Sequence, residues 1–172
     1  METKTIALQK TTVQTIEYSL LALSFFIPLF ISGPQLLTGV VVNMFLFLIT
    51  MRSYSTKSLL MIALPSVGAL LNGLIFGTFT PYLLYFLPFI WMSNYVLVQS
   101  FRFISLKKPF LMSLIGSSVM KSLFLFVIAY IFTSTKIVPQ IFLQAMGIFQ
   151  LITALLGGGI AFGVNKIISQ KE

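Results

Sequence analysis

The chain has 172 residues, of which 58% are hydrophobic and 8% are charged, and its formal net charge is +8. Soluble domains carry about 25% charged residues, so this composition excludes an ordinary soluble domain and predicts a single transmembrane domain over residues 1–172. The chain contains no Cys and no His. Disulfides and imidazole metal sites are thereby excluded, and haem, zinc and iron–sulfur clusters would lack their usual ligands. We therefore expect no metal site and no cofactor.

Six apolar runs follow one another along the chain. A helix that crosses a bilayer needs roughly 20 apolar residues, and these runs approach or exceed that length. Pro34, Pro81, Pro109 and Pro139 each open a run, which suits the first position of a helix. The runs cover about 17–32, 34–51, 58–77, 81–103, 109–133 and 139–168. The sequence thus predicts an all-α integral membrane protein, a bundle of six transmembrane helices.

The positive charges test this count, because all but one of them lie between the runs or at the ends of the runs. With six helices, Lys136 alone falls in the connections on one side. The other side receives Lys4, Lys10, Arg52, Lys57, Arg102, Lys107, Lys108, Lys166 and Lys171. Cytoplasmic loops hold the excess of Lys and Arg, so we expect cytoplasmic N and C termini in a multi-pass protein of the cell membrane. The lipid bilayer, rather than nucleic acid, then explains the positive charge.

Lys121 is the one cation deep inside a run, near the middle of 109–133, whereas Arg102 and Lys166 fall at the ends of their runs. A charge at this depth costs several kcal/mol unless it faces protein, water or a counter-ion. Ser113 and Ser117 share a helix face with Lys121 at a spacing of four, so we expect Lys121 to point into the bundle rather than snorkel to an interface. The three acids of the chain lie at its ends or at the edge of the first run: Glu2, Glu17 and Glu172. An anionic ligand could supply the missing counter-ion.

Other polar and aromatic side chains at membrane depth are candidate binding residues with Lys121. Each amide alone has a simpler explanation as a helix–helix hydrogen bond, a lone deep Trp as core, and an outer ring as part of the interfacial belt. Together they suit a small planar or carboxylated solute, which the rings would stack on and the amides orient. The candidate substrate-binding residues are Asn43, Asn72, Tyr85, Trp91, Asn94, Lys121, Gln144 and Gln150.

No catalytic residue is predicted. Acid–base or nucleophilic chemistry would have to proceed without His, Cys or a buried acid, so we do not expect an enzyme. Small residues at a spacing of four predict close helix contacts, either within the bundle or with a partner subunit. They are Ala69, Gly73 and Gly77 in the third run, and Ala154 with Gly158 and Gly159 with Gly163 in the sixth.

The chain resembles the substrate-binding S components of energy-coupling factor (ECF) transporters. Its size, basic charge and six runs carry most of the resemblance. The local features are Pro34 to Gly39 leading to Asn43, Pro65-Ser66 through Asn72-Gly73, and Gln150 through Gly158 with Ala161. The resemblance implies capture of a vitamin or precursor in the outer half of a bacterial membrane protein. It also implies vitamin uptake driven by an ECF coupling subunit and two ATPase subunits, with no hydrolysis by this chain.

Two alternatives remain open. A stand-alone small secondary transporter would commonly use an intramembrane carboxylate for ion coupling, and the runs offer none. A membrane assembly or scaffold protein would need no ligand, and Lys121 would then bind carbonyl groups or a partner's carboxylate. ATP-independent uptake by liposomes would indicate the first alternative, and copurification with a fixed protein partner but no solute would indicate the second.

Overall fold

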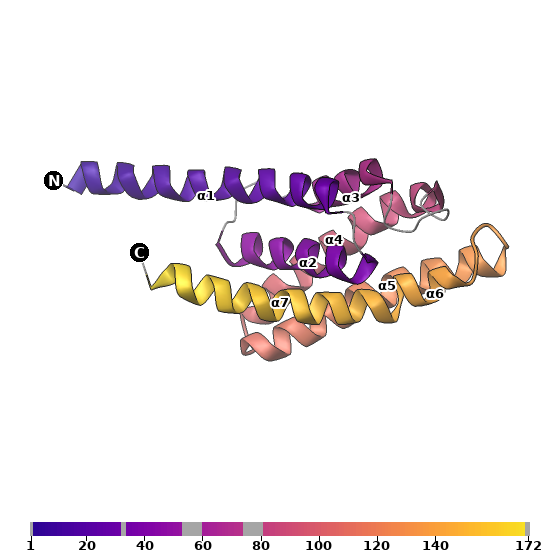
Figure 1. Ribbon diagram of the computed structural model, residues 1–172. Helices are drawn as coiled ribbons and strands as arrows, with labels where there is room; N and C mark the ends of the chain where they lie inside the picture. The colour runs from indigo at the N-terminus through magenta and orange to yellow at the C-terminus, as the bar shows by residue number, and fades with distance from the viewer. Residues whose placement is uncertain (1, 32–33, 53–59, 74–80, 171–172) are drawn as a thin grey trace.

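The computed structural model describes residues 2–31, 34–52, 60–73 and 81–170, and these residues form seven α-helices and no strand (Figure 1). The helices are α1 (Glu2–Phe30), α2 (Gln35–Arg52), α3 (Leu60–Asn72), α4 (Leu83–Ser105), α5 (Phe110–Ser134), α6 (Ile141–Met146) and α7 (Ile148–Ser169). The predicted all-α class is confirmed for the described part of the chain. The helices begin and end within a few residues of the predicted runs, apart from α1, which begins earlier, and α3, which ends earlier.

Four stretches are long and apolar enough to cross a membrane: α2, α4, α5, and Ile141–Ser169, which joins α6 to α7. The apolar helical stretches Glu17–Phe30 and Leu60–Asn72 are shorter. At a rise of 1.5 Å per residue each covers about 20 Å, against a hydrocarbon core of about 30 Å. Helix α3 ends early because Gly73 adopts a positive φ of 70°, the left-handed conformation that terminates many helices. Length and composition therefore support four of the six predicted spans.

The last predicted run is one stretch in sequence but two helices in the structure. Gly147 separates α6 from α7 with φ −98° and ψ −99°. A Cβ atom at this position would lie 2.7 Å from the Leu143 carbonyl oxygen and 2.9 Å from Cδ2 of Phe126. Such approaches are too close for any side chain, so the break is compatible with glycine alone.

Helices α2 and α7 run side by side in the same direction. Asn43 in the middle of α2 bonds to Thr153 in the second turn of α7, and Arg52 bonds to Asn165 near the ends of both helices. The other extensive helix pairs are α4 with α5 and α1 with α3. Helix α1 begins, and α7 ends, at the same end of the molecule (Figure 1).

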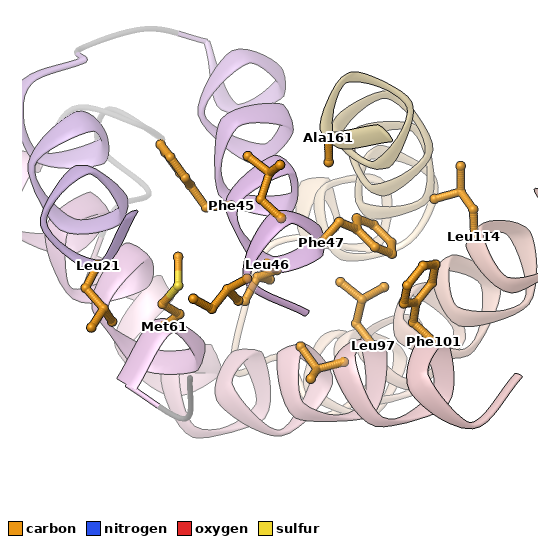
Figure 2. Packing of buried hydrophobic residues seen from close by; sticks show 12 residues of the cluster. Leu21, Phe45, Leu46, Phe47, Met61, Leu97, Phe101, Leu114 and Ala161 are labelled. Atoms are coloured by element: carbon orange, nitrogen blue, oxygen red, sulfur yellow. The ribbon is translucent and has the colours of Figure 1, made fainter. Parts of the chain in front are cut away.

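A large apolar cluster fills the half of the molecule nearest the C-terminal end of α7. Figure 2 shows side chains of six helices converging there, with Leu46 and Phe47 of α2 in the middle. The rings of Phe47 and Phe101 meet edge to face, with centroids 5.1 Å apart, a favoured arrangement of aromatic pairs. In a lipid environment such packing, more than hydrophobic burial, holds helices together.

A second apolar cluster occupies the opposite half, where α4, α5 and α6 meet. The rings of Phe86 and Phe142 stack there at a centroid distance of 5.2 Å. Along α5, Leu114 belongs to the first cluster and Leu125 to the second. Lys121 therefore lies between the two clusters, where the structure gathers polar side chains.

The predicted small-residue contacts of α7 fall on two different faces. Ala154 and Gly158 are buried, as expected for contact within the bundle. The closest approach of α7 to a neighbouring backbone is at Gly157, where a Cβ atom would lie 2.6 Å from a carbonyl oxygen of α2. Gly159 and Gly163 are exposed, and a Cβ atom on either would meet nothing within 4 Å.

The predicted contacts of α3 were misplaced by one position. Gly68 is the residue against which α1 packs, and a Cβ atom there would collide with the Phe25 carbonyl oxygen. Ala69 is only partly buried and Gly73 is exposed at the end of the helix. Gly77 lies outside the described residues.

Candidate functional site

Lys121 is at the centre of the polar side chains that lie between the two apolar clusters, and it is only 2% exposed. Its Nζ donates to Oδ1 of Asn43 and to Oδ1 of Asn94, both at 2.7 Å. These residues come from α5, α2 and α4 respectively, so a single amine connects three helices. The distances are typical of charge-assisted hydrogen bonds. The predicted interior position of Lys121 is confirmed.

The protein fixes the orientation of both amides. Nδ2 of Asn43 donates to the Gly39 carbonyl oxygen at 2.9 Å and to Oγ1 of Thr153 at 3.1 Å. Nδ2 of Asn94 donates to the Ile62 carbonyl oxygen at 2.9 Å. With their nitrogens directed to these acceptors, both amides present their oxygens to Lys121. We name this arrangement of Asn43, Asn94 and Lys121 the lysine clasp.

The clasp borders a cavity of about 90 Å³. The cavity lies near the beginnings of α2, α4 and α7 and the end of α3, in the half of the molecule opposite the C-terminal end of α7. Its polar lining consists of Gln35, Thr38, Asn43, Ser66, Asn94, Lys121, Gln150 and Thr153. Apart from Gly39, the remaining lining is apolar. This combination of an apolar wall with a few convergent polar groups is typical of small-molecule sites.

Four of the eight predicted binding residues line the cavity: Asn43, Asn94, Lys121 and Gln150. Trp91 lies behind the wall, where its Nε1 donates to Oγ of Ser66 at 2.7 Å. Because Ser66 is itself a lining residue, Trp91 positions a cavity group without facing the cavity.

The other three predicted residues lie elsewhere. Nδ2 of Asn72 donates to the Leu29 carbonyl oxygen at 2.7 Å, which joins α3 to α1 and matches the simpler explanation for a single amide. Tyr85 is 55% exposed, and its ring lies 6.4 Å from that of Tyr82. Gln144 is exposed on α6. None of the three is part of the cavity lining.

Sequence reasoning missed four polar lining residues: Gln35, Thr38, Ser66 and Thr153. The sequence of α2 contained a usable signal. Thr38 and Asn43 follow Gln35 by three and eight positions, which is the spacing of residues on one helix face. Gln150 and Thr153 have the same three-residue spacing on α7. The prediction considered amides, aromatic rings and Lys121 within the runs, and it overlooked the hydroxyl groups on the same faces and the amide of Gln35 at the beginning of α2.

The arrangement can bind and orient a solute, but the lining offers little for bond chemistry. Lys121 is the single ionisable side chain among the lining residues. The buried acid Glu17 precedes the first apolar cluster on α1 and does not line the cavity. Among the described residues, no group of three or more His, Cys, Asp or Glu side chains could hold a metal ion.

Comparisons of the chain with protein-family models, with curated proteins and with solved structures give no match.

Proposed function

We propose that this chain is a membrane protein that binds a small organic anion, and that it serves as the substrate-binding subunit of an ATP-driven uptake system of the ECF type. One observation carries the proposal. A buried lysine is held by two neutral amide oxygens beside a cavity, so its positive charge is oriented but not cancelled. An anion in that cavity would receive both the charge and a directed hydrogen bond.

The distribution of charge supports a proposed orientation with six spans and cytoplasmic termini. Arg52 and Lys166 lie in the last turns of α2 and α7, and Lys107 and Lys108 follow α4. All four lie at the end of the molecule away from the cavity. Lys136 lies in the turn after α5, near the cavity end. By the excess of Lys and Arg, the cavity half would face outward, where a solute can be captured.

A partner that supplies energy is part of the proposal because the chain shows no means of its own. Its sequence lacks the GxxxxGK[ST] loop that binds nucleotide phosphates. The lining also lacks a carboxylate for ion coupling. The resemblance to S components supplies the identity of the expected partners, one coupling subunit and two ATPases.

The test is to identify solutes retained by the gently purified, full-length protein in lipid nanodiscs, using mass spectrometry after release. We expect one anionic solute at near-stoichiometric amounts. Lys121→Met should reduce its retention or affinity more than tenfold, whereas Lys107→Met, which removes an exposed charge in a turn, should change neither. Equal retention by Lys121→Met would refute the proposal.

One observation favours a second candidate, an assembly protein without a ligand. The two Asn oxygens give Lys121 acceptors without any solute. This candidate predicts that no small molecule copurifies, that a membrane protein partner does, and that Lys121→Met leaves the partner bound.

A further inference from the structure

The hydrogen-bonding groups around the cavity are largely occupied by one another. Lys121 uses two of its three donors on Asn43 and Asn94, and both amides are also bonded through their nitrogens. These two side chains therefore have little left with which to recognise a ligand. They act chiefly as holders of the lysine.

Two lining hydroxyl groups are occupied in the same way. Oγ of Ser66 donates to the Ala63 carbonyl oxygen and accepts from Trp91. Oγ1 of Thr153 donates to the Gln150 carbonyl oxygen and accepts from Asn43. Each hydroxyl has one proton, so neither can donate to a ligand without breaking a bond within the protein.

Among the buried polar side chains of the lining, two groups remain available; the amides of Gln35, whose Nε2 donates to the Ala145 carbonyl oxygen, and of Gln150 are only half-buried. Lys121 has a third N–H, for which the described residues provide no further acceptor. Thr38 is 5% exposed, and its Oγ1 has no hydrogen-bond partner among the described residues. A buried hydroxyl left without a partner is costly, and both residues line the same small cavity. Thr38 is therefore the second contact that a ligand would satisfy.

The rest of the cavity limits the size and polarity of the ligand. Its volume of about 90 Å³ is below the roughly 150 Å³ of an engineered cavity that holds benzene. Most of its wall is apolar, including Leu70, Leu83, Leu87, Ile90 and Phe149. Apart from the half-buried amides of Gln35 and Gln150, a second charge or several hydroxyl groups on the ligand would face hydrocarbon, which is unfavourable.

We infer that the cavity selects compact monoanions with an apolar body, monocarboxylates being the simplest class. One carboxylate oxygen accepts from Lys121, and a ligand oxygen pairs with the Thr38 hydroxyl. The apolar body lies against the leucine-rich wall. This inference rests on the proposed solute-binding function and narrows it, since dianions, phosphate esters and polyols are disfavoured.

A matched set of four-carbon probes tests the selectivity on the full-length protein in nanodiscs: butyrate, its neutral amide butyramide, and the dianion succinate. Binding is measured by saturation-transfer NMR and by competition with any retained solute. We expect butyrate to bind at least tenfold more tightly than either of the others. Equal or tighter binding of succinate or butyramide would overturn the inference.

The same experiment separates failure of this inference from failure of the proposed function. A retained dianion that depends on Lys121 overturns the selectivity but leaves the proposed anion binding intact, whereas a retained polyol or cation overturns both. A retained monocarboxylate supports both. If no solute is retained and no probe binds, both are overturned.

Thr38→Val tests the second contact, because valine has nearly the same shape without the hydroxyl. The unfolding midpoint should be unchanged or higher, since an unpaired buried hydroxyl is removed, while butyrate affinity should fall three- to tenfold. Thr50→Val is the control: Thr50 is buried on the same helix, but its hydroxyl donates to the Leu46 carbonyl oxygen outside the cavity. If Thr38→Val binds butyrate as the wild type does, the assigned contact is wrong.

Discussion

Replacing the lysine clasp by apolar side chains should separate its contribution to stability from its role in binding. Asn94→Leu removes one acceptor of Lys121 and a bond to Ile62. A hydrogen bond to a charged group contributes about 1.5–3 kcal/mol, and a neutral one between membrane helices about 0.6 kcal/mol. Asn94→Leu should therefore lower the free energy of unfolding by about 2–4 kcal/mol. Lys121→Met leaves two buried amide oxygens without their donor and should cost a similar amount, about 2–4 kcal/mol.

The triple variant Asn43→Leu, Asn94→Leu, Lys121→Met should recover most of this loss. Replacing a whole buried charged group by apolar residues is often neutral or stabilising, whereas removing one member is not. The groups left behind keep partners: the Gly39 and Ile62 carbonyls lie within helices, and Thr153 still donates to Gln150. We expect the free energy of unfolding of the triple variant to lie within about 1 kcal/mol of the wild-type value. We also expect this variant to retain no solute.

The stability of each variant is measured by thermal unfolding, followed by the fluorescence of Trp91, the single tryptophan of the chain. For a domain of this size 1 kcal/mol corresponds to about 2–4 °C in Tm, so each single variant should melt roughly 4–16 °C lower. Retention of the solute is measured by mass spectrometry after release. Single variants that melt like the wild type would contradict the clasp geometry. A triple variant that still retains the solute would contradict its role in binding.

Three further changes test the surrounding structure. Gly157→Ala places a Cβ atom 2.6 Å from a backbone oxygen of α2 and should lower the free energy of unfolding by about 1–3 kcal/mol. Gly159→Ala, whose Cβ atom meets nothing within 4 Å, should be neutral or slightly stabilising. Equal Tm values for the two variants would argue against this helix contact. Gly147→Ala should lower the free energy of unfolding by about 1–3 kcal/mol, because its Cβ atom would clash with Phe126 of α5 and with the Leu143 carbonyl oxygen of α6. An unchanged Tm would mean that the break between α6 and α7 is absent. Trp91→Phe removes the bond to Ser66, worth about 1 kcal/mol, so solute affinity should fall about fivefold at most while the fold persists; a complete loss of binding would place Trp91 in the site itself.

The interior position of Lys121 could be predicted because the physics leaves few choices. A cation at mid-membrane depth must face protein or water, and Ser113 and Ser117 mark the buried face of the same helix. Both serines are fully buried in the structure. The depth of Lys121 in the membrane and its helix face were therefore sufficient to predict its interior position on α5.

The amides were predicted less well, because depth along a helix does not specify which neighbour a side chain meets. Asn72 and Asn94 are both polar residues within apolar helices, yet one bonds to α1 and the other to Lys121. Gln144 was placed by extending one helix through residues 139–168. The break at Gly147 separates α6 from α7, so the periodicity of α7 gives no information about the face of Gln144.

The choice of amides in the clasp has an electrostatic consequence. A carboxylate beside Lys121 would cancel its charge, whereas Asn43 and Asn94 provide acceptors and leave the cavity with a net charge of one. Asn94→Asp should thus form an ion pair with Lys121, because Asp has the same shape as Asn and an opposite charge at this distance attracts strongly. We expect the fold to persist and anion affinity to fall more than tenfold, while Asn165→Asp, beside Arg52 at the far end of the molecule, leaves it unchanged. If Asn94→Asp binds the anion as tightly as the wild type, the uncancelled charge of Lys121 is not what attracts the ligand.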